Sequence, residues 1–281
     1  MSVMQSLSEI KRFVRGPAVE TGNRTARVIA VAARKGGVGK TTTTVNLGAD
    51  LARLGRKVLL IDMDAQGHVQ MSLRDEARGR SKETLSDVLL SRRRDVQELV
   101  QPTSIDGLWF VGSDHSLNDT ESIMGTKIGK ELLLRQALKY ARTHYDVILI
   151  DCPPNLGTLT VNALVACDQV LIPCDLSTLS LDGVDALLDT LETIQDTLNP
   201  DLSLLGLVRT RVDRRNKSMN AAIEATLTQR YGHFMLPVEI GVSTAIAKAQ
   251  HAGQPVSLFD SQSRGAKGYQ ALAVEIDRRL G

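Results

Sequence analysis

The stretch that decides the fold is Arg34-Lys35-Gly36-Gly37-Val38-Gly39-Lys40-Thr41-Thr42. The apolar residues 28–33 precede it and predict a buried strand, and residues 43–54 follow with apolar side chains at helical spacing. A glycine-rich loop between a strand and a helix turns its backbone N–H groups inward, and the helix N-terminus adds the positive end of its dipole. This order of elements predicts a loop that holds phosphate groups.

Two side chains of the loop add their own chemistry. Lys40 is placed to reach the terminal phosphates of a nucleotide, and Thr41 is placed to put its hydroxyl on Mg²⁺. The match to the P-loop pattern G-x-x-x-x-G-K-[ST] is incomplete, because Arg34 stands where the first glycine belongs. The three glycines that follow still supply the flexibility that such a loop needs.

The length and composition of the chain limit the classes of protein to which it can belong. A chain of 281 residues fits one large α/β domain and can bury a core without disulfides or metal staples. Its three cysteines show no C-x-x-C spacing, which favours a reducing cytosol. No apolar run approaches the roughly 18 residues of a membrane-spanning helix, and the N-terminus lacks a signal-peptide core. We therefore expect a cytoplasmic protein, and the net charge of +2 says little about its partners.

A second apolar run, residues 57–61, ends in Asp62-Met63-Asp64-Ala65-Gln66-Gly67. In open α/β sheets, ligands bind at the carboxyl ends of the strands. Two carboxylates beside a triphosphate are costly unless they meet a metal ion, a lysine or a water molecule that must lose a proton. We therefore expect Asp62 and Asp64 to belong to the phosphate site.

A third apolar run, residues 146–150, leads into Asp151-Cys152-Pro153-Pro154. An apolar strand that ends in an aspartate is typical of the Walker B element, in which the carboxylate binds Mg²⁺. We expect Asp151 to do so through a water molecule. Cys152 has nothing nearby that would activate its thiol, so we interpret it as a small buried residue.

Strands and helices alternate along the remaining chain. Residues 107–111, 170–173 and 202–208 predict strands, and residues 128–145 and 179–194 predict helices. This alternation predicts an α/β fold with a mostly parallel, doubly wound sheet, right-handed crossovers and helices on its flanks. Residues 1–26 predict a short amphipathic helix that could dock on the domain, contact DNA or a partner, or lie on a membrane.

A basic segment follows the strand at 202–208. Five cations against Asp213 give residues 209–217 a local charge of +4. Such side chains can neutralise phosphates without reading bases, which gives affinity that falls with salt. The alternative interpretation, a solvated loop, stays open.

The loop also resembles a known family, because Lys35-Gly36-Gly37-Val38-Gly39-Lys40-Thr41-Thr42 carries a second lysine at its start. It is similar to the deviant Walker A motif of the ParA/MinD family within the SIMIBI P-loop NTPases, and that lysine is the family's signature lysine. Residues 62–67 resemble the family's D-x-D-x-Q-G element, and residues 151–157 resemble its D-x-P-P-x-L-G switch segment. The resemblance covers about residues 27–280 and makes 27–281 a ParA-like ATPase domain that follows the 1–26 extension.

The resemblance implies an ATP hydrolase that needs ATP and Mg²⁺. Lys35 of each subunit would reach the other's phosphates in an ATP-bound homodimer, and Asp64 would orient the attacking water. Asp62 would contact the P-loop or the Mg²⁺ shell, and the segment containing Pro237 and Glu239 resembles a turn against the adenine. The implied nucleotide contacts are Lys35, Gly36, Gly37, Val38, Gly39, Lys40, Thr41, Thr42, Asp62, Pro237 and Glu239. The implied metal ligands are Thr41 and Asp151, and the implied catalytic residues are Lys35, Lys40 and Asp64.

The resemblance further implies nonspecific binding of double-stranded DNA. Residues 210–215 resemble the family's T-x-x-D-x-R element, whereas Gly241 replaces an arginine that chromosomal members carry, and cations further on could compensate. The expected DNA contacts are Arg211, Arg214, Arg215, Lys217, Lys248 and Lys267.

The function that we predict is that of a ParA/Soj-like ATPase. It would drive partition of a plasmid or chromosome, or position a cargo, on the nucleoid in the cytoplasm, and a ParB-like partner would stimulate hydrolysis. One alternative is a MinD-like ATPase with a membrane platform, which needs a basic amphipathic C-terminal helix. Another is an enzyme on the same scaffold, such as a nitrogenase-type reductase or a tyrosine kinase, which would need cluster cysteines or a tyrosine-rich end.

Overall fold

The computed structural model describes residues 25–78, 83–91, 94–213 and 217–281. Its centre is an eight-stranded sheet in the order β3-β4-β2-β5-β1-β6-β7-β8, in which each pair is parallel except β3–β4. The strands are β1 (Arg27–Val31), β2 (Val58–Asp62), β3 (Gln101–Pro102), β4 (Leu108–Val111), β5 (Val147–Asp151), β6 (Gln169–Asp175), β7 (Ser203–Val212) and β8 (Met235–Gly241). The predicted fold class is confirmed.

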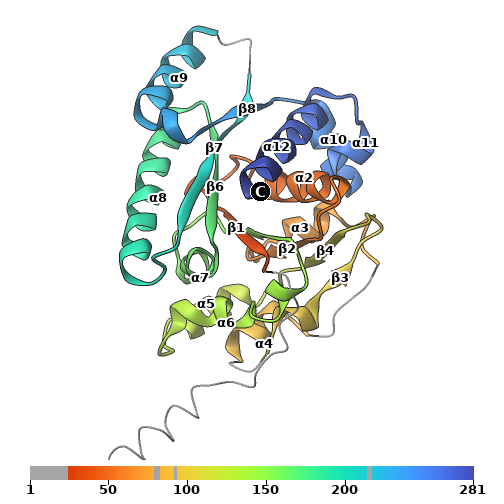
Figure 1. The fold of residues 1–281 in the computed structure, drawn as a ribbon, viewed down its shortest axis with the longest axis vertical. Coiled ribbons are helices and arrows are strands. Elements are labelled where there is room, and N and C mark those ends of the chain that lie inside the picture. Colours follow the sequence, from red (N-terminus) through yellow and green to blue (C-terminus); the bar gives the residue numbers. More distant parts are fainter. Residues whose placement is uncertain (1–24, 79–82, 92–93, 214–216) are drawn as a thin grey trace, which may run out of the picture.

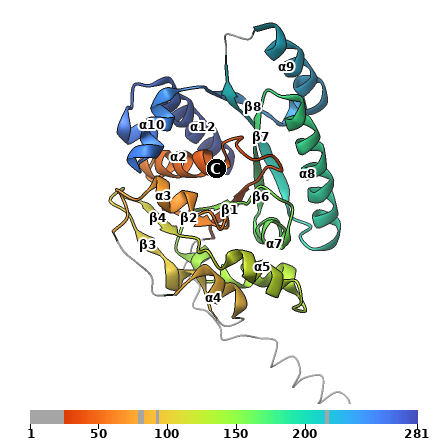
Figure 2. The same ribbon diagram turned by 180° about the vertical axis from the view of Figure 1, so that it is seen from behind.

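Helices cover both faces of the sheet (Figures 1 and 2). One face packs against α2 (Lys40–Arg53), α3 (His68–Ser72), α10 (Thr244–Ala252), α11 (Val256–Phe259) and α12 (Arg264–Leu280). The other packs against α4 (Leu85–Leu90), α5 (Leu117–Met124), α6 (Leu133–Ala137), α7 (Thr158–Ala166), α8 (Thr178–Thr197) and α9 (Lys217–Tyr231). Because both faces are covered, the central strands are apolar throughout rather than alternating.

Side chains of one strand divide between two apolar clusters. Val28 and Ala30 of β1 belong to the cluster under α4–α9, while Ile29 between them belongs to the cluster under α2. This alternation is the period of two that a strand imposes. The buried runs that the sequence shows are therefore central strands, with each residue packed on one side or the other.

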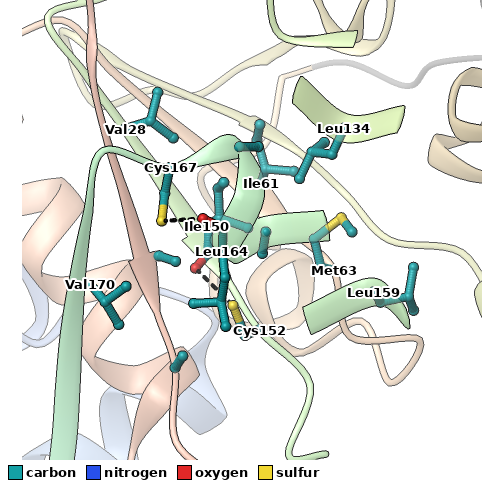
Figure 3. Packing of buried hydrophobic residues seen from close by; sticks show 14 of the residues in the cluster. Val28, Ile61, Met63, Leu134, Ile150, Cys152, Leu159, Leu164, Cys167 and Val170 are labelled. Carbon is teal, nitrogen blue, oxygen red and sulfur yellow. Dashed lines mark hydrogen bonds between the residues drawn. The ribbon is translucent and has the colours of Figure 1, made fainter. Parts of the chain in front are cut away.

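Figure 3 shows part of the cluster under α7, where Ile150 and Leu164 lie between two cysteines. Cys152 Sγ lies 3.9 Å from the carbonyl oxygen of Ile150, and Cys167 Sγ lies 3.4 Å from that of Leu164. Burial raises the pKa of the Cys167 thiol to about 12. All three cysteines are free and buried, so they act as small core residues, as we predicted for Cys152.

The continuous helix predicted over residues 128–145 is wrong. The chain there forms a 3₁₀ turn, η2 (Lys130–Leu132), then α6, then a second turn, η3 (Ala141–Thr143). Asp95, which caps η1 (Val96–Leu99), also accepts hydrogen bonds from the backbone N–H groups of Tyr140, at 2.8 Å, and Ala141, at 3.3 Å. Because this distant carboxylate accepts the two N–H groups, they do not need the carbonyl partners that a continuous helix would give them.

The segment around Pro237 also differs from the prediction. Instead of a turn it is part of β8, which pairs in parallel with β7 at the edge of the sheet. An edge strand tolerates a proline, which lacks an N–H to donate. The 3₁₀ turn η4 (Gly232–Phe234) connects α9 to this strand.

Part of the predictions lies outside the described residues, namely the helix over 1–26, apart from its last two residues, and the DNA contacts Arg214 and Arg215. Within the described part of the chain, no helix has the length and apolar character to cross a bilayer.

Candidate nucleotide-binding site

The phosphate loop lies at the centre of the sheet. β1 runs between β5 and β6 and leads into the loop, which ends at the first residue of α2. Gly37 and Gly39 have φ values of 76° and 92°, and Gly39 is the N-cap of α2. An L side chain rarely adopts this left-handed backbone, so the glycines are needed for the loop to turn its amides inward.

A cavity of about 640 Å³ opens over this loop. Its volume lies in the usual range for small-molecule sites. Its polar lining includes the P-loop, Asp64, Gln66, His68, Thr210 and Arg211, and its apolar lining includes Ile240, Val242, Ile246, Ala247 and Tyr269. No sequence motif marks the apolar lining residues, since they come from β8, α10 and α12 and from the segment between β8 and α10, far along the chain.

Lys40 lies at the base of the cavity and is almost fully buried. Its Nζ donates to the carbonyl oxygen of Lys35 at 3.3 Å. Burial lowers the pKa of this ammonium group, and the nearby carboxylate of Asp151 only partly opposes the effect. A buried cation of this kind gains most from an incoming anion, because the anion replaces the lost hydration.

The two predicted metal ligands are in direct contact. Thr41 Oγ1 donates to Asp151 Oδ2 at 2.7 Å, and Thr44 Oγ1 donates to Asp151 Oδ1 at 3.2 Å. Burial raises the pKa of Asp151 to about 7, although both hydroxyls and Lys40 oppose the shift. A hydroxyl and a carboxylate are the hard oxygen donors that Mg²⁺ prefers, so this pair fits such an ion.

Asp62 and Asp64 have different surroundings. Asp62 is fully buried, and its two oxygens accept the backbone N–H groups of Asp64 and Val69, each at 3.0 Å. Burial and the charge of Asp151 raise its pKa well above the usual value. Asp64 faces the cavity and accepts the N–H of Gln66 at 3.1 Å. Asp62 thus holds the loop that presents Asp64.

Lys35 extends away from Lys40, toward β6. Its Nζ donates to both oxygens of Asp175, at 2.8 and 3.1 Å, and to Ser177 Oγ at 2.8 Å. Ser177 is the N-cap of α8 and also donates to Asp175. The predicted signature lysine is therefore held by its own subunit.

Glu121 supports the site from outside the cavity. From α5, its Oε1 accepts the backbone N–H of Leu159 in the first turn of α7, at 3.1 Å. A Cβ added to Gly157 would lie only 2.3 Å from the same oxygen. Pro154 of the same segment lines the cavity. Glu121 thus fixes the segment that follows Asp151, and no local pattern marks it.

The structure does not bring the predicted adenine contacts to the P-loop cavity. Pro237 is exposed on β8. Glu239 lines a second cavity of about 810 Å³, together with Arg264 and Lys267, and the two cavities share residues 241–243 in their linings. Arg209 Nη1 lies 3.9 Å from Glu239 Oε2 and also pairs with Glu224.

The predicted DNA contacts are dispersed. Lys248 is exposed on α10, and Lys267 is exposed on α12 beside the second cavity. Lys217 begins α9. Arg211 instead lies against the P-loop, where its Nη1 donates to the carbonyl oxygen of Gly37 at 2.8 Å.

Comparison with known proteins agrees with this geometry. A family model described as an AAA domain matches residues 26–204. The chromosome partitioning protein ParA of Caulobacter vibrioides is 38% identical over 255 residues, which cover 90% of this chain and 94% of that protein. The chain belongs to the ParA/MinD family of P-loop ATPases.

Solved structures agree with the ParA/MinD assignment. The cobyrinic acid a,c-diamide synthase of Mycobacterium smegmatis, solved with bound ADP and magnesium, superposes with a TM-score of 0.74 at 33% identity and covers 90% of this chain and 95% of its own. The cell division ATPase MinD of Pyrococcus furiosus gives a TM-score of 0.73 at 25% identity, over 90% and 99% of the two chains. In this chain the deviant P-loop and Asp64 line one cavity, and Asp151 is buried behind Thr41, which donates a hydrogen bond to it.

Proposed function

We propose that this chain is a ParA-type ATPase that uses ATP to partition DNA or position a cargo. The observation that carries the proposal is the contact of Thr41 with Asp151, at 2.7 Å, beside the buried ammonium group of Lys40. These groups offer a metal-binding oxygen pair and a phosphate-binding cation at the end of one cavity.

The remaining groups support hydrolysis of a nucleoside triphosphate. Thr41 and Asp151 would hold Mg²⁺, which when bound offsets negative charge on the phosphates. Lys40 and the inward-facing amides of the loop bind the phosphate oxygens, and Asp64 orients the attacking water. Such a site works mainly by positioning and electrostatics, which suits side chains that are each held by named hydrogen bonds.

The cargo function needs an ATP-bound homodimer on DNA. Lys35 of each subunit would leave Asp175 and reach the partner's phosphates, and the exposed cations Lys248 and Lys267 would contact the DNA backbone without reading bases. A ParB-like partner on the cargo would stimulate hydrolysis and release the dimer. The protein would then be associated with the nucleoid in the cytoplasm. The similarity to ParA of C. vibrioides supports this proposal.

The packing of α12 favours a DNA platform over a C-terminal membrane platform. Leu272 and Ile276 on its apolar face are fully buried in the cluster with α2. Arg278 and Arg279, at its end, both pair with Glu275. An amphipathic membrane helix must present its apolar face to lipid, and here that face is already part of the core.

Phosphate release from ATP tests the enzymatic part. We expect Mg²⁺-dependent hydrolysis by the wild type and none by Lys40→Ala, with direct nucleotide binding also lost. Lys139→Ala, an exposed lysine, is the matched control and should behave as the wild type. Normal ATP affinity in Lys40→Ala would contradict the P-loop assignment.

Binding to a random-sequence DNA duplex tests the platform. We expect binding with ATP or a nonhydrolysable analogue, little with ADP, and a steep decrease with rising salt. Lys248→Glu combined with Lys267→Glu should weaken it while ATP-dependent dimerisation persists. A protein that dimerises with ATP but binds no DNA would shift the platform to lipid or protein, which binding to anionic vesicles would then reveal.

A further inference from the structure

Arg211 is unusual in its backbone. Among the described residues it is the non-glycine residue with a positive φ, 53°. A side chain disfavours this left-handed conformation, which is maintained only where surrounding contacts enforce it, and such residues gather at functional sites. Arg211 lies at an irregularity in the pairing of β7 with β8, between Arg209 and Val212, and such irregularities re-aim a side chain.

The redirected side chain of Arg211 and that of Thr210 contact the P-loop. Arg211 Nη1 donates to the carbonyl oxygen of Gly37 at 2.8 Å, and Thr210 Oγ1 donates to that of Val38 at 2.7 Å. Two consecutive residues of β7 thus bind two consecutive carbonyl groups of the loop. β6 separates β7 from β1 in the sheet, so these contacts join the loop to a strand other than the two that flank β1.

The position of the guanidinium group indicates a ligand. Arg211 lines the P-loop cavity, and a Cβ on Gly37 would lie 3.7 Å from its Nη1. Arg211 and Lys40 bring positive charge to the lining, against the carboxylate of Asp64. A guanidinium group stays charged at all relevant pH values and has five N–H donors, so one can hold Gly37 while others bind oxygen atoms of an anion.

We infer that Arg211 is a nucleotide-binding residue. Its guanidinium group contacts the phosphates of the bound nucleoside triphosphate while Nη1 holds the Gly37 carbonyl, so that β7 closes the P-loop on the ligand. The inference rests on the proposed function, and it replaces the DNA contact that the sequence led us to expect at this residue.

The test uses two variants of the full chain. Arg211→Gly removes the guanidinium group and accepts the positive φ, and Arg211→Lys keeps a charge but loses the planar fork. We expect Arg211→Gly to weaken binding of Mg²⁺ and ATP about ten-fold, the size of one charge-assisted hydrogen bond, and Arg211→Lys to recover part of it. The thermal unfolding temperature of the nucleotide-free Arg211→Gly variant should not fall below that of the wild type, because glycine relieves the backbone strain at this position.

Other outcomes would overturn the inference. The first is an ATP affinity of Arg211→Gly that equals that of the control variant Arg135→Ala, in which an exposed arginine on α6 is replaced. The second is a loss of DNA affinity at saturating ATP analogue with unchanged ATP affinity, which would make Arg211 a DNA contact. If Lys40→Ala binds ATP normally while Arg211→Gly does not, the role of Lys40 fails and that of Arg211 stands. A wild type that binds no nucleotide overturns both.

Discussion

Lys35 Nζ lies 2.8 Å from Asp175 Oδ2, so the lysine that we propose reaches a partner's phosphates is bound within its own subunit. Ser177 and Ser180 donate to the same carboxylate. Although burial raises the pKa of Asp175, the hydrogen bonds from Lys35 and the two serines hold it below its usual value. Any interaction that needs the charge of Lys35 elsewhere must therefore first break its hydrogen bonds with Asp175, and the loss of these bonds opposes that interaction.

Replacement of Asp175 by asparagine should favour the ATP-bound dimer. The variant loses the charge that holds Lys35 but keeps the side-chain size, so about 1 kcal/mol of internal interaction no longer has to be broken. Because the dimer releases two such lysines, one from each subunit, we expect the dimer dissociation constant with ATP to fall about 25-fold, as measured by analytical ultracentrifugation. Asp182→Asn, an exposed residue of α8, is the control. Dimerisation that is unchanged or weaker in Asp175→Asn would show that the contact does not compete.

Asp64→Ala should separate binding from hydrolysis. The carboxylate faces the cavity and makes a local turn contact with the N–H of Gln66, so its loss leaves the P-loop intact. We expect ATP affinity within about two-fold of the wild type and hydrolysis reduced by a factor on the order of 100 or more. Phosphate release and dimer mass under ATP measure the two properties, with exposed Asp106→Ala as control. Wild-type turnover in Asp64→Ala would refute the role given to Asp64.

Gly157→Ala should disturb the segment after Asp151 through Glu121. The new Cβ would meet Glu121 Oε1 at 2.3 Å and displace it from the N–H of Leu159. Because only the end of a flexible side chain must move, we expect a loss of about 1 kcal/mol in urea unfolding, the value of one hydrogen bond. In a Glu121→Ala background the same substitution should cost little. An equal cost in both backgrounds would show that the clash is not with Glu121.

The stability of the metal-free, nucleotide-free protein should decrease as the pH rises. The folded pKa of Asp151 is about 7, above its usual 3.8, and that of Asp62 is also raised, so the folded state binds more protons between these values. The contribution of Asp151 to stability is therefore greatest near pH 4 and is lost as the pH rises to about 7, and the raised pKa of Asp62 acts in the same direction. Urea unfolding in EDTA should show this decline.

Asp151→Asn tests the assignment of that decline. The amide cannot ionise but still accepts a hydrogen bond from Thr41, so the variant should be more stable than the wild type at pH 8 and differ little at pH 4. A variant that is less stable at pH 8 would indicate that the Asp151 carboxylate is held in its charged form.

Local patterns predicted most of the nucleotide site. β1, β2 and β5 are buried on both faces, so each appears as an apolar run, and their carboxyl ends deliver Lys40, Asp64 and Asp151 to one edge of the sheet. The same reasoning failed for residues 128–145, where the side chain of Asp95 interrupts the helix from about 45 residues away. It also failed for β8, whose pairing with β7 no local spacing reveals.

The sequence by itself determined the loop, the order of strands and helices, and the phosphate chemistry, because these depend on residues that are neighbours along the chain. Only the tertiary structure decided where the cations of the site point. Lys35 meets Asp175 across 140 residues and Arg211 meets Gly37 across 174. Both contacts arise because β6 lies beside β1 and β7 lies beside β6, and that strand order is set by how the whole sheet packs between its two layers of helices.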